Sequence, residues 1–205
     1  SAAGLNLFSF FGSTQHYEHP YWTKNGQVTL AFQDAEIRKL LSVNPNACFL
    51  PRLFATAPAW WVQEHPEETC RFAWEKKGVP VRESFASEAC LRESGEAYRR
   101  AVRYLMDAEY GKNLLGIHVA NGPWGENFHW DAYYSATTNP AASDLSEPMR
   151  RRLIRYLREK YGNDVARLRD TWKDASLTFE SVKVPGAAQR RQLTAGAWRD
   201  PQQSR

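Results

Sequence analysis

The sequence predicts an α/β fold of the (β/α)8-barrel type, on three observations. Apolar segments of strand length alternate with amphipathic helices along the 205 residues, which is the order in which βαβ units build a parallel sheet. The apolar segments are nearly continuous rather than alternating, as in strands buried on both faces. The segments after the strands are long and rich in aromatic and charged residues, as in barrels that carry their chemistry at the carboxyl ends of the strands.

A doubly wound, nucleotide-binding sheet is the competing architecture. Its phosphate loop would follow the first strand, but the residues there, Phe11-Gly12-Ser13-Thr14, lack the GxGxxG and GxxxxGK[ST] spacings. The barrel is therefore favoured. A complete barrel has eight strands and about 250 residues, so we expect residues 1–205 to form part of a single catalytic domain, with about three to four βα units of its barrel.

Three segments are expected to be strands because they are short, apolar and bounded by polar or helical sequence. They are Leu5–Phe11, Ala47–Ala55 and Asn113–Ala120.

Two helices are expected among these strands. Residues 34–43 place apolar side chains on one face and stop at Asn44-Pro45, because proline disfavours helical geometry in the residue before it. A longer helix is expected from Ser87, a suitable N-cap, to Tyr110, with Gly111 as its stop. The apolar stripe of the longer helix contains Tyr98, Ala101, Val102 and Leu105.

The third expected helix carries the net charge. Residues 146–161, SEPMRRRLIRYLREKY, hold six cations and two anions, an excess equal to the +4 of the whole chain. Its apolar residues recur at helical spacing, which leaves the arginines for an opposite, solvated face. Ser146 caps it, Gly162 ends it, and a short fourth helix follows over 164–172. Although the pI is about 9.0, we expect no nucleic-acid partner.

Cysteine usage and hydropathy indicate in which kind of cellular compartment the protein is expected. Cys48, Cys70 and Cys90 form no CxxC pair and have no histidine at metal-ligand spacing, so we expect inert thiols rather than a zinc site or a disulfide framework. Such thiols favour the cytoplasm, although the sequence does not specify the compartment. No apolar run reaches the roughly 18 residues of a membrane span, and the first residues lack a secretory signal pattern. We therefore expect a soluble protein without a membrane partner.

The first group of candidate site residues follows the second strand. Arg52 lies near the strand's end, where a guanidinium can bind a hydroxyl or a carboxylate. Pro58, Trp60 and Trp61 come next and are expected to form a rigid aromatic wall. Stacked tryptophans suit the apolar faces of sugar rings, but the same residues would also serve simply to cover the end of a barrel.

The second group follows the third strand, in GIHVANGPWGENFHWDAYY. His118 and Asn121 lie at the strand's carboxyl end, and the amide of Asn121 suits a sugar hydroxyl. Five aromatic residues surround Glu126. Because such surroundings desolvate a carboxyl group, its pKa rises toward neutrality, as a general acid for glycoside hydrolysis requires. The aromatic residues are Trp124, Phe128, Trp130, Tyr133 and Tyr134.

A metal site made of His118, Glu126 and His129 is the alternative use of this segment. The spacing does not match HExxH, so we expect no metal, and no organic cofactor is implied. The chain also lacks the GxSxG pattern of a serine nucleophile.

The combination of NPNACFLPRLFATAPAWWVQEHPEE, RRAVRYLMDAEYGKNLLGIHVANGPWGENFHW, RYLREKYGNDVARLRDTW and AWRDP resembles the catalytic barrel of β-galactosidase-like glycoside hydrolases, the family 42 type of clan A. The similarity runs from about Leu5 to Pro201, and its most family-like segment is Leu157–Trp172.

This resemblance implies a retaining hydrolase of β-linked glycosides, most often galactosides, with two catalytic glutamates. Strand Asn113–Ala120 would be the fourth of the barrel and Glu126 the general acid/base. Clan A usually has Asn directly before that glutamate, whereas Gly125 stands there and Asn121 lies five residues earlier. The nucleophile is expected after the seventh strand, beyond Arg205. The residues expected to bind the sugar are Arg52, Trp60, His118, Asn121, Trp124 and Trp130.

Two further expectations follow from the resemblance. The expected partner is a carbohydrate substrate. The resemblance leaves open whether the protein forms a homo-oligomer. A carbohydrate-binding or degenerate barrel protein without hydrolysis is the alternative, because the second carboxylate of a retaining enzyme is not identified in this chain.

Overall fold

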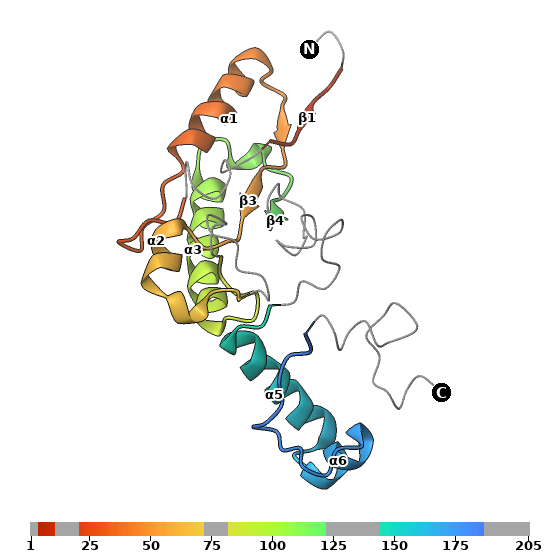
Figure 1. The fold of residues 1–205 in the computed structure, drawn as a ribbon. Helices are drawn as coiled ribbons and strands as arrows, with labels where there is room; N and C mark the ends of the chain where they lie inside the picture. Colours follow the sequence, from red (N-terminus) through yellow and green to blue (C-terminus); the bar gives the residue numbers. More distant parts are fainter. Residues whose placement is uncertain (1–3, 11–20, 72–81, 122–143, 187–205) are drawn as a thin grey trace. The chain divides into compact units, whose positions relative to one another are not determined.

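A computed structural model describes residues 4–10, 21–71, 82–121 and 144–186. The chain divides into two compact units (Figure 1): Ser1–Glu64 with Ala89–Trp130, and His65–Glu88 with Asp131–Arg205. That both belong to one catalytic domain stays a prediction.

Parallel strand segments form the centre of the first unit. Strand β1 (Leu7–Phe8) pairs with β2 (Cys48–Phe49), and β3 (Arg52–Phe54) pairs with β4 (His118–Ala120), both in parallel. A parallel bridge between Phe49 and Leu114 joins the two pairs. The three segments predicted to be strands therefore run side by side in their order along the chain, as consecutive βα units require.

The strands are shorter than expected. The segment Ala47–Ala55 is interrupted between β2 and β3, at Pro51, which has no backbone N–H to donate to the ladder. In the segment Asn113–Ala120 only the last three residues form a strand, because a 3₁₀ turn, η2 (Gly111–Asn113), precedes it.

Three helices cover this sheet. Helix α1 (Ala31–Val43) begins three residues earlier than expected, and α3 (Glu88–Asp107) ends three residues before Tyr110. The chain turns sharply after α3, where a Cβ on Gly111 would lie 2.1 Å from the carbonyl oxygen of Met106. Helix α2 (Ala59–Glu64) was not expected, and it begins where the Pro58 carbonyl accepts the N–H of Trp61.

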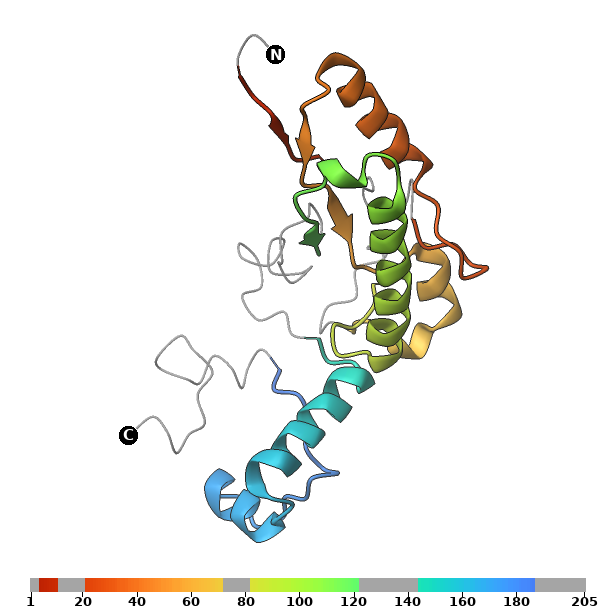
Figure 2. The same cartoon turned by 180° about the vertical axis from the view of Figure 1, so that it is seen from behind.

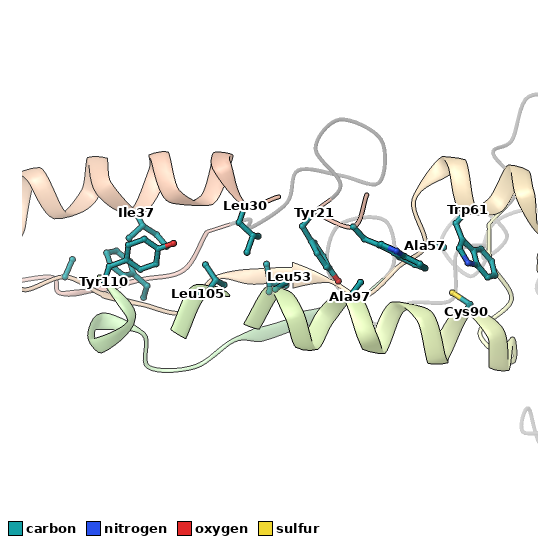
Figure 3. Packing of buried hydrophobic residues seen from close by; sticks show 14 residues of the cluster. Tyr21, Leu30, Ile37, Leu53, Ala57, Trp61, Cys90, Ala97, Leu105 and Tyr110 are labelled. Carbon is teal, nitrogen blue, oxygen red and sulfur yellow. The ribbon is translucent and has the colours of Figure 1, made fainter. Parts of the chain in front are cut away.

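The core of the first unit lies between the strands and the helices. Figure 3 shows Ile37 of α1, Leu53 of β3 and Leu105 of α3 packed together, all fully buried. The predicted stripe of α3 is confirmed in part: Ala101 and Leu105 are fully buried, whereas Tyr98 and Val102 pack at the edge of the cluster.

The second unit contains η1 (Pro66–Glu68), α5 (Glu147–Tyr161) and α6 (Val165–Trp172). The predicted ends of α5 are confirmed: Ser146 accepts the N–H of Met149, and Gly162 adopts the left-handed conformation with a φ of 64°. A small apolar core joins the two helices to the chain that follows. Its buried residues are Leu157, Tyr161, Leu168, Phe179 and Val182.

The arginines of α5 stay at least partly exposed, as predicted, and they also form ion pairs. Each of five pairs with a carboxylate within the second unit, and the Arg158 guanidinium also lies 4.8 Å from the centre of the Phe179 ring. The helix therefore uses its positive charge to bind neighbouring acidic residues of its own chain. The pairs are Arg150–Glu147, Arg151–Glu68, Arg152–Glu88, Arg155–Glu88 and Arg158–Glu180.

All three cysteines are free thiols, with Cys70 and Cys90 buried and Cys48 half-buried. None of the helices that the structure describes has the length and apolar character needed to cross a membrane.

Candidate functional site

Two predicted site residues are neighbours on adjacent parallel strands. Arg52 of β3 stands in register with His118 of β4, and residues paired in this way share one face of a sheet. Both side chains are half-buried. The structure therefore brings together a guanidinium and an imidazole that lie 66 residues apart in the sequence.

The face that carries this pair is the one turned away from the helices. Side chains alternate along a strand, and Leu53, the residue after Arg52, is fully buried in the core formed with α1 and α3. Figures 1 and 2 show these helices on one side of the strands. Because helices surround the sheet of a (β/α)8 barrel, Arg52 and His118 belong to its interior face.

The carboxyl ends of β3 and β4 lie one layer above this pair. Phe54 is in register with Ala120 on the same interior face, and both side chains are buried. The Ala55 N–H donates to the Ala120 carbonyl at 2.9 Å, so the two chains remain together to their ends. Asn121, half-buried, is the first residue beyond β4. The predicted residues thus occupy two levels, with Asn121 at the edge and Arg52 and His118 beneath it.

The two tryptophans predicted to form a wall have different environments. Trp61 is fully buried, and its indole N–H donates to Glu93 Oε2 at 2.8 Å. In Figure 3 it lies over Cys90 of α3. The wall prediction is therefore wrong for Trp61, which covers the core. Trp60 is half-buried, and it packs against the edge of the same core.

The remaining predicted site residues lie outside the described residues. They are Trp124, Glu126 and Trp130, and their roles stay predictions. The alternative metal site also involves Glu126 and His129, which the structure does not describe. Among the described residues, no group of three or more His, Cys, Asp and Glu side chains is placed to hold a metal ion.

A buried polar cluster in the second unit is the other concentration of ionisable groups. The Asp144 carboxylate accepts the Ser84 hydroxyl at 2.5 Å and the N–H groups of Arg71 and Ser146 at 3.1 and 2.9 Å. Burial, with the nearby Asp144 carboxylate as the next cause, raises the pKa of the Cys70 thiol well above its usual range. A carboxylate with three donors and an unreactive thiol form a structural anchor for the start of α5 rather than a site of chemistry.

The sequence interpretation missed two aromatic residues that lie next to predicted site residues. Phe54 covers the interior face above Arg52, and the alternation of side chains along β3 is the signal that would have placed it there. Trp22 contacts Trp60 with ring centroids 5.3 Å apart. The sequence signal for Trp22 was weaker. Trp22 lies three residues before Asn25-Gly26, a pair that favours tight turns.

Comparison with known proteins shows similarity at the level of structure. No family model matches the chain, and no curated protein matches it. A β-galactosidase from Bacillus circulans sp. alkalophilus matches 91% of this chain and 25% of its own, with 13% identity and a TM-score of 0.63. A β-galactosidase from the Antarctic haloarchaeon Halorubrum lacusprofundi matches 90% of this chain and 26% of its own, with 18% identity and a TM-score of 0.55.

Two further structures extend the similarity. A catalytic mutant of a GH42 β-galactosidase from G. stearothermophilus matches 88% of this chain and 24% of its own, with 16% identity and a TM-score of 0.58. The catalytic domain of a β-amylase from Paenibacillus polymyxa matches 90% of this chain and 47% of its own, with 10% identity and a TM-score of 0.58.

The sequence resemblance is confirmed at the level of the fold. The chain spans about a quarter of the length of the β-galactosidases that it matches, and β1 to β4 form an open sheet without a closed barrel in the part of the chain described. The chain therefore has the fold of part of a (β/α)8 barrel of the kind found in glycosidases, including the GH42 β-galactosidases.

Proposed function

We propose that the protein to which this chain belongs is a retaining glycoside hydrolase that acts on β-linked galactosides. The observation that carries the proposal is the register of Arg52 with His118 on the interior face of a barrel of the glycosidase kind. The pair supplies hydrogen-bond donors beneath the carboxyl ends of the strands, where barrels of this fold bind their substrates. Sugar hydroxyls are the partners that such donors suit.

Each residue has a defined role in the proposed reaction. Glu126, protonated, donates its proton to the glycosidic oxygen while a second carboxylate, expected beyond Arg205, attacks the anomeric carbon and the C–O bond breaks. Glu126, now ionised, then removes a proton from the water that releases the sugar. Arg52, His118 and Asn121 hold the sugar hydroxyls during both steps. This chemistry needs only the two carboxyl groups.

Replacing the proposed acid tests the assignment. In the complete protein, Glu126→Gln is expected to abolish most turnover of β-galactosides with poor leaving groups, because these require protonation of the departing oxygen. Substrates with good leaving groups, such as nitrophenyl galactosides, should lose less in their first step. Glu159→Gln, on the exposed surface of α5, is the matched control and should retain full turnover. Turnover of poor leaving groups by Glu126→Gln at the wild-type rate would refute the role.

Carbohydrate binding without hydrolysis is the second candidate. It is favoured by the pair of Arg52 and His118, because a guanidinium and an imidazole can bind sugar hydroxyls without any catalytic carboxylate. Calorimetry that shows galactoside binding, with no sugar released over long incubation of the complete protein, would support this candidate over the hydrolase.

A nucleic-acid partner is not proposed. The five paired arginines of α5 already have carboxylate partners within the second unit, and a protein that binds DNA or RNA must offer its cations to phosphates instead.

A further inference from the structure

A tight turn in the first unit carries an exposed Asn-Gly pair. An antiparallel bridge between Trp22 and Val28 closes this turn. Within it, the Gly26 N–H donates to the Thr23 carbonyl at 3.0 Å, and Gly26 has a φ of 74°. Asn25 and Gly26 are both exposed, and nothing lies within 4 Å of the position that a Cβ on Gly26 would occupy. Water therefore has access to the pair.

The side-chain amide of Asn25 is polarised at its oxygen. Oδ1 accepts the Gln27 N–H at 3.2 Å and also the Thr23 hydroxyl. Donors at this oxygen stabilise the negative charge that develops there when a nucleophile attacks the carbon, Cγ. Within the residues that the structure describes, the amide nitrogen Nδ2 makes no hydrogen bond. The carbonyl of Asn25 is thus held by the turn, whereas its amino group is free to leave.

We propose that Asn25-Gly26 is a site of spontaneous deamidation, a covalent modification whose only co-reactant is water. The Gly26 nitrogen loses its proton to hydroxide and attacks Cγ of Asn25, so that an N–C bond forms. The Cγ–Nδ2 bond then breaks, Nδ2 takes up a proton and leaves as ammonia, and a five-membered succinimide remains. Water opens this ring at either carbonyl, which yields aspartate or isoaspartate. The inference is independent of the proposed function.

Glycine makes this asparagine more reactive than others in the chain. Because Gly26 has no Cβ, its nitrogen is less hindered than that of any other residue. That nitrogen must first release the Thr23 carbonyl, and local opening of an exposed turn permits this at low cost. Asn46 offers the contrast, because the next residue, Ala47, is fully buried and donates its N–H to a main-chain carbonyl at 3.0 Å. Asn25 is therefore expected to react well before Asn46.

The modification is expected to loosen the turn. An isoaspartyl residue routes the main chain through the former side chain, which adds a methylene group between the two arms. Two hydrogen bonds depend on the present spacing: the Thr23 N–H donates to Gln27 at 3.0 Å, and the Thr29 N–H donates to Tyr21 at 2.8 Å. Tyr21 and Trp22 are buried in the core of the first unit, so the change would extend from the exposed turn to the core.

Peptide mapping of aged protein tests the proposal. The complete protein would be kept for several days at mildly alkaline pH and physiological temperature, digested with trypsin and analysed by mass spectrometry. The peptide 25–38 should gain an aspartyl and an isoaspartyl form roughly tenfold faster than the peptide that contains Asn46, because the glycine nitrogen is unhindered. Asn121 also precedes a glycine, but it belongs to a different tryptic peptide.

Two variants are the controls. Gly26→Asp retains a residue type that tolerates the left-handed backbone but adds a Cβ, and it should slow the reaction at Asn25 roughly tenfold. Asn25→Gln, whose longer side chain would have to close a six-membered ring, should abolish it. Equal rates in the wild type and Gly26→Asp would overturn the proposal, as would a peptide 25–38 that stays unmodified while the Asn46 peptide changes. Hydrogen exchange of residues 21–29 should be faster in the aged protein, and unchanged exchange would refute the loosening of the turn.

Discussion

At the scale of single residues, Glu88 shows how the chain uses its positive charge. The carboxylate pairs with Arg155 and lies 3.8 Å from Arg152 Nη1. The hydrogen bond from Arg155, followed by the charge of the same guanidinium, holds the pKa of Glu88 below its ordinary value of 4.5. The pair is exposed, so salt screens it. Glu88 and Arg155 both belong to the second unit, although they lie far apart in the sequence.

This pairing predicts a pH dependence of stability. Because the folded chain binds the Glu88 proton less tightly than the unfolded chain, the pair contributes its full stabilisation above pH 4.5 and loses it as the pH falls through the lowered pKa. Glu88→Gln should therefore flatten the dependence of the unfolding free energy on pH on the acid side of 4.5. Urea titrations of the full chain across this range measure the effect. Glu159→Gln is the control, and an unchanged acid slope in Glu88→Gln would refute the pairing.

At the scale of elements, the ends of α5 and α6 follow directly from local chemistry. Ser146, Gly162 and Asp164 all have the cap roles that their residue types predict. Asp164 has the stronger cap, since its carboxylate accepts the N–H groups of Ala166 and Arg167 at 2.8 and 3.1 Å. Such caps could be predicted because they depend only on a few neighbouring residues.

Removal of this cap has a defined cost. Asp164→Ala is expected to lower the unfolding free energy by about 1 kcal/mol, because two N–H groups of the first turn of α6 lose their acceptor. Asp170→Ala, in the same helix, removes only an exposed ion pair with Lys173 and should cost roughly 0.5 kcal/mol or less. Urea unfolding followed by circular dichroism measures both variants. Equal losses in the two would contradict the capping role of Asp164.

Elements that depend on distant contacts were predicted less well. The six-residue helix α2 is too short to show a helical period, and its aromatic residues were interpreted as a loop wall. The end of α3 depends on the close approach of Gly111 to the Met106 carbonyl. The three strand segments were found because their apolar runs are continuous, but their hydrogen-bonded lengths depend on partners that a local pattern does not identify.

At the scale of the whole molecule, the sequence predicted the barrel type and the strands that carry Arg52 and His118. The register that pairs the two residues depends on how β3 and β4 align, and no local pattern specifies that alignment. The same holds for the layer formed by Phe54 and Ala120 above them, and for the burial of Trp61. The fold comparisons agree with the barrel interpretation over about nine-tenths of the chain.

The stereochemistry of galactoside hydrolysis tests the central claim most directly. The complete protein would be incubated with a β-galactoside, and proton NMR would follow the anomer of galactose that appears before mutarotation. A retaining mechanism with Glu126 as acid/base releases β-galactose first. Release of α-galactose first would contradict the retaining mechanism, and the absence of any released galactose would contradict the hydrolase.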